Sequence, residues 1–115
     1  ASGKRTAVIY ELRIYTALPG KQEAMLSRFR DHTTRLFEKH GMRNIGYWTN
    51  YAGGRYGELI YLLAFEDVAQ RERAWNAFSA DPEWRDACDE SERDGPIVSH
   101  SENRLLAPTD FSPLS

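Results

Sequence analysis

The sequence predicts a single α+β domain built from four strands and two long helical segments. Strand-like stretches occur at 8–15, 43–51, 58–65 and 97–106. Between the first and second of these stretches, and between the third and fourth, apolar residues return at the spacing of an amphipathic helix. The expected order of elements is therefore β-α-β-β-α-β.

The first strand, residues 8–15, carries two charges in its middle. Alternation places Glu11 and Arg13 on one face, together with Ile9 and Tyr15. The opposite face then carries Val8, Tyr10, Leu12 and Ile14. Charges inside a core strand need partners, and a chain this short has little surface of its own to bury them against. We therefore expect a second subunit to cover this charged face.

The first helical segment is expected from about Lys21 to His40. Pro19-Gly20 supplies the turn before it, and Gly41 is a typical helix stop. Its apolar arc consists of Met25, Leu26, Phe29, Thr33, Leu36 and Phe37. This arc gives the helix one side to bury.

The second and third strands form a predicted hairpin. Arg43–Tyr51 and Glu58–Phe65 flank a connection that contains Gly53-Gly54. The third strand is apolar on both faces, which is typical of a central strand that is covered on both sides.

Two capping patterns define the second helical segment. Asp67 with Gln70 resembles a helix start, and Asp81-Pro82-Glu83 restarts a helix with an Asp cap and Pro at the first helical position. Gly95-Pro96 ends this helix before the last strand. The tail, residues 107–115, contains Pro and Ser breaks and is expected to be extended.

This order is the ferredoxin-like arrangement, a four-stranded antiparallel sheet with helices on one face. We expect one domain over residues 1–115, with its core at 7–106 and the tail at 107–115. Because the third strand is apolar on both sides, the face without helices is expected to close against the same face of a second copy.

Composition excludes several classes of protein. The chain has 115 residues, of which 41% are hydrophobic and 28% charged, with a net charge of −2. Basic and acidic residues are interspersed, so neither nucleic acid nor a membrane surface is an expected partner. The single cysteine, Cys88, allows no intramolecular disulfide. Without a long apolar stretch or signal peptide in the sequence, we expect a cytoplasmic protein.

Several short segments, in their order and spacing, resemble the NIPSNAP family, within the dimeric α+β barrel superfamily. The matching segments are Tyr10-Glu-Leu-Arg-Ile-Tyr-Thr16, Pro19-Gly20, His40-Gly41, Gly46-Tyr-Trp48, Leu59–Phe65, Asp81-Pro-Glu-Trp84, Glu102-Asn-Arg-Leu-Leu106, Pro108 and Phe111-Ser-Pro113. The resemblance implies a homodimer whose two sheets face each other as a barrel. It implies no particular reaction, because members of this family mostly lack an established activity.

Two Glu-x-Arg pairs are candidates for a polar network. Glu11 and Arg13 lie on the first strand, and Glu102 and Arg104 lie on the fourth, which is its neighbour in this fold. The structural interpretation is a salt-bridged network inside the dimer barrel that fixes register and partner. The functional interpretation is an arginine that holds a carboxylate ligand through two hydrogen bonds.

Four residues are candidates for ligand binding: His32, Trp48, Tyr10 and Asn103. His32 lies at the edge of the first helix's apolar arc, where it is either a base facing a helix–sheet pocket or a half-buried structural histidine. Trp48 and Tyr10 either line a cavity for a flat ligand or belong to the core. By resemblance to superfamily relatives that oxygenate quinols or degrade haem, Asn103 joins Trp48 and His32 as a polar contact.

No metal site or cofactor is expected. His100 has no second ligand at metal spacing, and His40 sits at a helix end, where it meets the helix carbonyls. Gly53-Gly54 with Gly57 joins two strands and lacks the Lys-Ser/Thr of a phosphate loop. Cys88 is expected to pack on its helix.

Three functions remain open from the sequence. The first is a homodimer that binds an apolar or aromatic small molecule in a helix–sheet pocket. The second is an enzyme related to cofactor-independent monooxygenases. The third is a structural or partner-binding dimer with a filled core. A cavity of about 300 Å³ or more lined by His32 and aromatic residues favours the first two, and solid packing favours the third.

Overall fold

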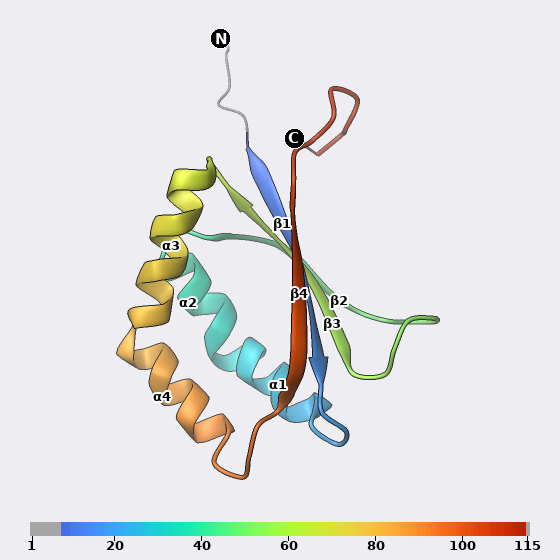
Figure 1. Cartoon of the computed structure of the whole chain (residues 1–115), viewed down its shortest axis with the longest axis vertical. Helices are drawn as coiled ribbons and strands as arrows, with labels where there is room; N and C mark the ends of the chain where they lie inside the picture. The colour runs from blue at the N-terminus through green and yellow to red at the C-terminus, as the bar shows by residue number, and fades with distance from the viewer. Residues whose placement is uncertain (1–7, 115) are drawn as a thin grey trace.

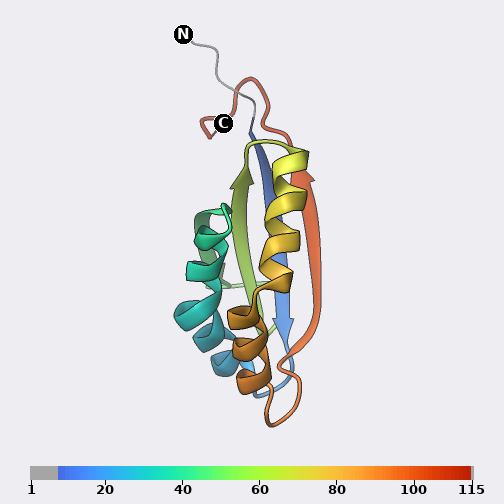
Figure 2. The same cartoon turned by 90° about the vertical axis from the view of Figure 1, so that its left-hand side faces the viewer.

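The computed structural model describes residues 8–114 and confirms the predicted α+β class. Its sheet is antiparallel, with the strands in the order β2-β3-β1-β4. The strands are β1 (Ile9–Ala17), β2 (Arg43–Thr49), β3 (Glu58–Phe65) and β4 (Val98–Leu106). All helices lie on one face of this sheet (Figures 1 and 2). The predicted ferredoxin-like order of elements is confirmed.

The first helical segment spans the predicted range in three pieces. These are α1 (Gln22–Arg28), the π-helical turn η1 (Phe29–Thr33) and α2 (Thr34–Lys39). Gly41 ends the segment with φ of 86°, a conformation that glycine adopts without a steric penalty. The π turn was not visible in the sequence pattern.

The second segment consists of α3 (Val68–Ala80) and α4 (Pro82–Ser91). The predicted caps form: the side chain of Asp67 accepts a hydrogen bond from the Gln70 amide at 2.7 Å, and that of Asp81 accepts one from the Glu83 amide at 2.8 Å. The tail is not extended throughout. The Ser112 amide donates to the Thr109 carbonyl at 3.2 Å, which closes a turn.

Aromatic rings fill the layer between the sheet and the helices. Phe37 lies at the centre, 4.9 Å from Phe78, 5.5 Å from Trp75 and 6.0 Å from Tyr61 between ring centroids. Tyr47 stacks on Tyr61 at 5.0 Å. These spacings are those of interlocked aromatic pairs, so this layer is a packed core.

The other side of the sheet, named the open face, has no helix over it (Figure 1). Strand register assigns to it the residues Tyr10, Leu12, Ile14, Ile60, Leu62, Ala64, Arg43, Gly46, Trp48, Glu102 and Arg104. The middle of this face is therefore an apolar stripe along β1 and β3, and its charged residues lie on the edge strands β2 and β4 and at the start of β3, where Glu58 lies.

Candidate functional site

The most concentrated chemistry of the molecule surrounds Glu11, whose side chain is fully buried and points toward the helices. Its Oε1 accepts hydrogen bonds from Arg71 Nε at 2.9 Å and Trp75 Nε1 at 3.0 Å. Its Oε2 accepts from Arg13 Nη1 at 2.9 Å, Arg71 Nη2 at 3.0 Å and Asn103 Nδ2 at 2.8 Å. These five residues are named the Glu11 cluster.

The hydrogen bonds decide the charge state of Glu11. Burial acts to raise its pKa, because a carboxylate loses hydration in the interior. Hydrogen bonds from Arg71 and Asn103 outweigh burial, and Trp75 and the charge of Arg13 act in the same direction. The pKa of Glu11 is therefore lowered to about 2, and the side chain is a carboxylate at neutral pH.

Arg13 is fixed on every side of its guanidinium group. Besides its bond to Glu11, its Nε donates to the Tyr61 hydroxyl at 2.9 Å and its Nη2 to the Tyr15 hydroxyl at 3.2 Å. Its Cζ lies 4.5 Å from the centroid of the Trp75 ring, within cation–π range. Burial tends to lower the pKa of Arg13, but the Tyr61 and Tyr15 hydroxyls raise it above its usual range.

The predicted placement of the polar network was wrong for Glu11 and Arg13. These two residues face the helices, and the chain itself supplies their partners. Glu102 and Arg104 lie opposite Ile14 and Leu12 of β1, on the open face. They therefore do not join Glu11 within the chain, because neighbouring residues of a strand point to opposite faces. Asn103, between them, is the β4 residue that reaches Glu11.

Sequence reasoning did not identify Arg71 or Trp75 as partners of Glu11. The two residues are four positions apart on α3, so they share one side of that helix. This spacing was a usable signal, because a buried carboxylate requires donors from the element that covers it. The cluster ties β1 to β4 and to α3, the helix that covers these strands.

The geometry suits the Glu11 cluster to holding structure rather than to acid–base chemistry. A general base needs a pKa near the working pH and access to a substrate proton. Glu11 has a pKa of about 2, has no exposed surface and already accepts five hydrogen bonds.

A histidine of a helix–sheet pocket would lie between a helix and the sheet. His32 does not lie there. It lines a groove of about 260 Å³ between the first helical segment and α4. The other lining residues are Ala24, Ser27, Arg28, Asp31, Ala87, Glu90 and Ser91. No aromatic residue is among them, so His32 does not line the aromatic cavity that would favour a ligand-binding or oxygenase function.

Arg28 forms the buried part of this groove. Its side chain is 4% exposed, and its Nη1 donates to Glu92 Oε2 at 2.9 Å and to Ser91 Oγ at 3.2 Å. Its Nε is buried and has no hydrogen-bond partner among residues 8–114.

Tyr10 and Trp48 both belong to the open face, on different strands. Tyr10 is buried, and within residues 8–114 its hydroxyl finds no hydrogen-bond partner. Trp48 is 53% exposed. The candidate ligand-binding residues His32, Trp48, Tyr10 and Asn103 therefore do not converge on one pocket.

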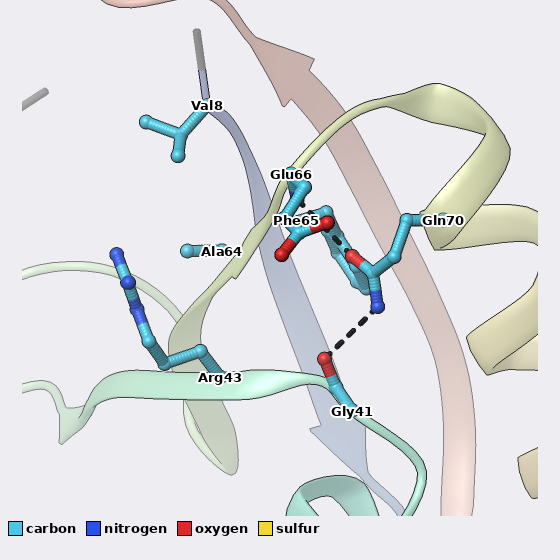
Figure 3. Close-up of a pocket in the computed structure, with 7 residues that line it drawn as sticks. All are labelled: Val8, Gly41, Arg43, Ala64, Phe65, Glu66 and Gln70. Carbon is cyan, nitrogen blue, oxygen red and sulfur yellow. Dashed lines mark hydrogen bonds between the residues drawn. The ribbon is translucent and has the colours of Figure 1, made fainter. Parts of the chain in front are cut away.

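A further cavity of about 140 Å³ opens at the end of β3 (Figure 3). Its wall is held by Gln70, whose side chain donates to the Gly41 carbonyl at 3.0 Å and accepts from the Glu66 amide at 3.1 Å. Arg43 lies across the cavity from Gln70 (Figure 3). None of the predicted site residues lines it.

The described residues, 8–114, contain no group of three His, Cys, Asp or Glu side chains placed to hold a metal ion. Within the same residues, no helix combines the length and the apolarity needed to cross a membrane.

The sheet, with its helices on one face, defines a ferredoxin-like α+β domain of the kind found in dimeric α+β barrels. The NIPSNAP family model matches residues 10–113, and the chain therefore belongs to the NIPSNAP family. The resemblance read from the sequence is thus confirmed.

Curated relatives are longer than this chain. Mouse NipSnap homolog 3B is 31% identical over 88 residues, which cover 75% of this chain and 35% of the relative. Human NipSnap homolog 3A is 28% identical, with the same coverage. The chain thus spans about a third of the length of these relatives.

Solved structures of similar length share the fold. A NIPSNAP family protein of unknown function from Agrobacterium tumefaciens superposes with a TM-score of 0.82, at 26% identity and 97% coverage of each chain. A NIPSNAP-like domain protein from Burkholderia xenovorans superposes with a TM-score of 0.81 at 26% identity, and the match covers 95% of this chain and 91% of that one. SnoaB, a cofactor-independent oxygenase from Streptomyces nogalater, superposes with a TM-score of 0.62 at 15% identity, and the match covers 93% of this chain and 98% of SnoaB. This last likeness shows the fold alone.

Proposed function

We propose that this protein acts as a homodimer joined through the open face, as a structural or partner-binding module with a filled core. The observation that carries the proposal is the apolar stripe of that face. Leu12, Ile14, Ile60 and Leu62 lie there on the two central strands and are only partly buried. A four-stranded sheet with an apolar second face needs a cover, and an identical face supplies one by two-fold symmetry.

The shape of the chain supports the same proposal. The β2–β3 hairpin and the tail after β4 both project from the sheet on the side away from the helices (Figure 1). Tyr51 and Tyr56 in the hairpin and Phe111 in the tail are among the most exposed aromatic residues. These projections give a second copy additional apolar surface to contact.

The packed aromatic layer favours this function over a ligand pocket between helices and sheet. Phe29, Phe37 and Tyr61 interlock there, and the Glu11 cluster occupies the part of this layer next to β4. A small-molecule site at that position would have to displace side chains that hold the fold.

Analytical ultracentrifugation of the wild type and of Leu62→Asp tests the proposal. A charge on the central stripe should convert the dimer to a folded monomer at micromolar concentration, because the carboxylate would be buried without a partner. Val68→Asp is the matched control, since Val68 is 53% exposed on α3, away from the open face. A wild-type monomer at micromolar concentration would refute the proposal.

A second candidate function is binding of a small molecule in the groove beside His32. The specific observation is Arg28, which is buried in the wall of the groove with one nitrogen left without a partner among residues 8–114. Such an arginine suits a ligand that carries a carboxylate. Calorimetric titration with small aromatic carboxylates, comparing the wild type with Arg28→Met, tests it; heats that are unchanged in the variant would contradict it.

The oxygenase alternative has only the shared fold in its support, and a fold does not specify a reaction. Oxygen uptake with a panel of hydroquinones, comparing the wild type with His32→Ala, tests it directly. Uptake that depends on His32 would establish the alternative in place of a structural role.

A further inference from the structure

The strongest unexplained feature of the open face is Trp48. Its ring is 53% exposed, although tryptophan is the largest apolar side chain in the protein. The ring lies flat against Gly46: a Cβ atom at that position would be 2.5 Å from Cη2 and 2.8 Å from Cζ2 of the indole. Because Gly46 has no side chain, the indole ring packs directly against the backbone of β2 at this position. One side of the indole is fixed, and the other side faces outward.

A hollow lies at the opposite edge of the same face. It has a volume of about 220 Å³, several times the roughly 30 Å³ that a water occupies in the liquid. Leu12 and Ile14 form its apolar floor, and Glu102 and Arg104 of β4 stand beside it as exposed charges. An aromatic ring with a polar N–H group fits this combination of surfaces.

The ring and the hollow lie at the same level along the strands. Trp48 is opposite Ile60, Ile60 is opposite Ile14, and Ile14 is opposite Glu102. The next row across the sheet runs from Gly46, on which the ring rests, through Leu62 and Leu12 to Arg104.

Two-fold symmetry brings these two features together. When two copies of the open face meet about an axis parallel to the strands, the order β2-β3-β1-β4 is reversed in the partner. The β2 edge of one copy then covers the partner's β4 edge, and residues at one level stay at one level. Trp48 therefore lies over the partner's hollow, and the contact occurs twice.

We propose that Trp48 of each protomer is the anchor of the homodimer and packs into the hollow beside the partner's Arg104. The outward side of the indole lies against the partner's guanidinium, in a cation–π contact. The indole N–H donates to the carboxylate of the partner's Glu102. This inference rests on the proposed homodimer and assigns its axis, its central contact and a role for Glu102 and Arg104.

The contact has the properties of an interface hot spot. Tryptophan and arginine are the residues most enriched at such positions. Because Gly46 already holds the ring in place, little rotamer freedom is lost when the dimer forms.

The first test is a double-mutant cycle on the dimer dissociation constant, measured by sedimentation equilibrium. Trp48→Ala should weaken the dimer roughly 30-fold or more, as expected for a hot spot. Arg104→Ala should weaken it less, and the double variant should match Trp48→Ala, because the arginine loses its only role once the ring is absent. Val68→Ala, which shortens a side chain that is 53% exposed on α3 and away from the open face, is the control and should leave the constant unchanged.

A second variant keeps the tryptophan and moves it. Gly46→Ala adds a Cβ where the ring now rests, so it should displace the indole and weaken the dimer while the folded chain remains. Circular dichroism of the diluted monomer checks that the sheet persists.

Cross-linking distinguishes the two possible axes. In a Cys88→Ser background, Trp48→Cys with Glu102→Cys should give an intermolecular cross-link with a short bis-maleimide reagent, because these two positions lie at the same level and facing sheets pack about 10 Å apart. Trp48→Cys alone should give no cross-link. A cross-link from Trp48→Cys alone would place β2 over β2 and overturn the inference. Additive effects in the cycle, or a Trp48→Ala dimer as tight as the wild type, would also overturn it while leaving the homodimer intact. A monomeric wild type would overturn both.

Discussion

Replacing Glu11 by Gln tests the role that the structure gives to the buried carboxylate. The change keeps the shape of the side chain and removes its charge. The guanidinium groups of Arg13 and Arg71 then lose their shared partner, and Asn103 faces an amide in place of a carboxylate. Breaking a buried ion pair by neutralising one partner costs about 3–5 kcal/mol.

The pKa of Glu11 gives an independent magnitude. Lowering this pKa from 4.5 to about 2 in the folded state corresponds to about 3 kcal/mol of stability. Because the folded pKa is the lower one, this stability is fully present above pH 4.5. It is lost as the pH falls from 4.5 toward 2, where the carboxylate takes up a proton in the folded chain as well.

The assay is urea unfolding of the wild type and of Glu11→Gln between pH 7 and pH 2.5. Both chains carry Leu62→Asp, which is expected to keep the proposed dimer out of the comparison. The two free energies of unfolding should differ by about 3 kcal/mol at pH 7 and should converge below pH 4.5. Glu66→Gln, at an exposed glutamate, is the matched control and should follow the wild type. A constant difference across this range, or one below about 1 kcal/mol at pH 7, would refute the assignment of Glu11 as a buried, charged partner.

Three further outcomes are expected. Arg13→Ala should lower the free energy of unfolding by about 3–5 kcal/mol in the same unfolding assay, because Glu11 loses one of its charged partners. The double variant Glu11→Leu/Arg13→Met should recover much of this loss. In sedimentation, the folded fraction of Arg13→Ala should dimerise like the wild type, since Arg13 faces the helices and not the open face. Asp81→Ala should lower the thermal midpoint, because this residue caps α4 and holds Lys39 at 2.9 Å; calorimetry that showed no change would contradict the capping role.

Several features could be predicted from the sequence because they depend on residues close together in the chain. The caps at Asp67 and Asp81 formed as predicted, since a capping side chain and its amide are two or three residues apart. The order of strands and helices follows from local periodicity in the same way. The NIPSNAP family was also visible in short segments and their spacing.

The location of the charged cluster could not be predicted from local patterns. Alternation along β1 shows that Glu11 and Arg13 share a face of the sheet. It does not show whether that face is the one covered by the helices, because the side chains alternate in the same way on both faces. Which face the helices cover is decided by how α3 crosses the sheet, and this places Arg71 and Trp75 over Glu11.

Which β4 residues face the helices and which face the open side also depends on the tertiary structure. Its register against β1 pairs segments that are about 90 residues apart, and a shift of one position exchanges the two faces. The observed register gives Asn103 to the buried cluster and leaves Glu102 and Arg104 on the open face. The sequence by itself determined the elements and the family, because these are written in local spacing. Only the folded chain decided which charges are buried together, because that depends on contacts between distant segments.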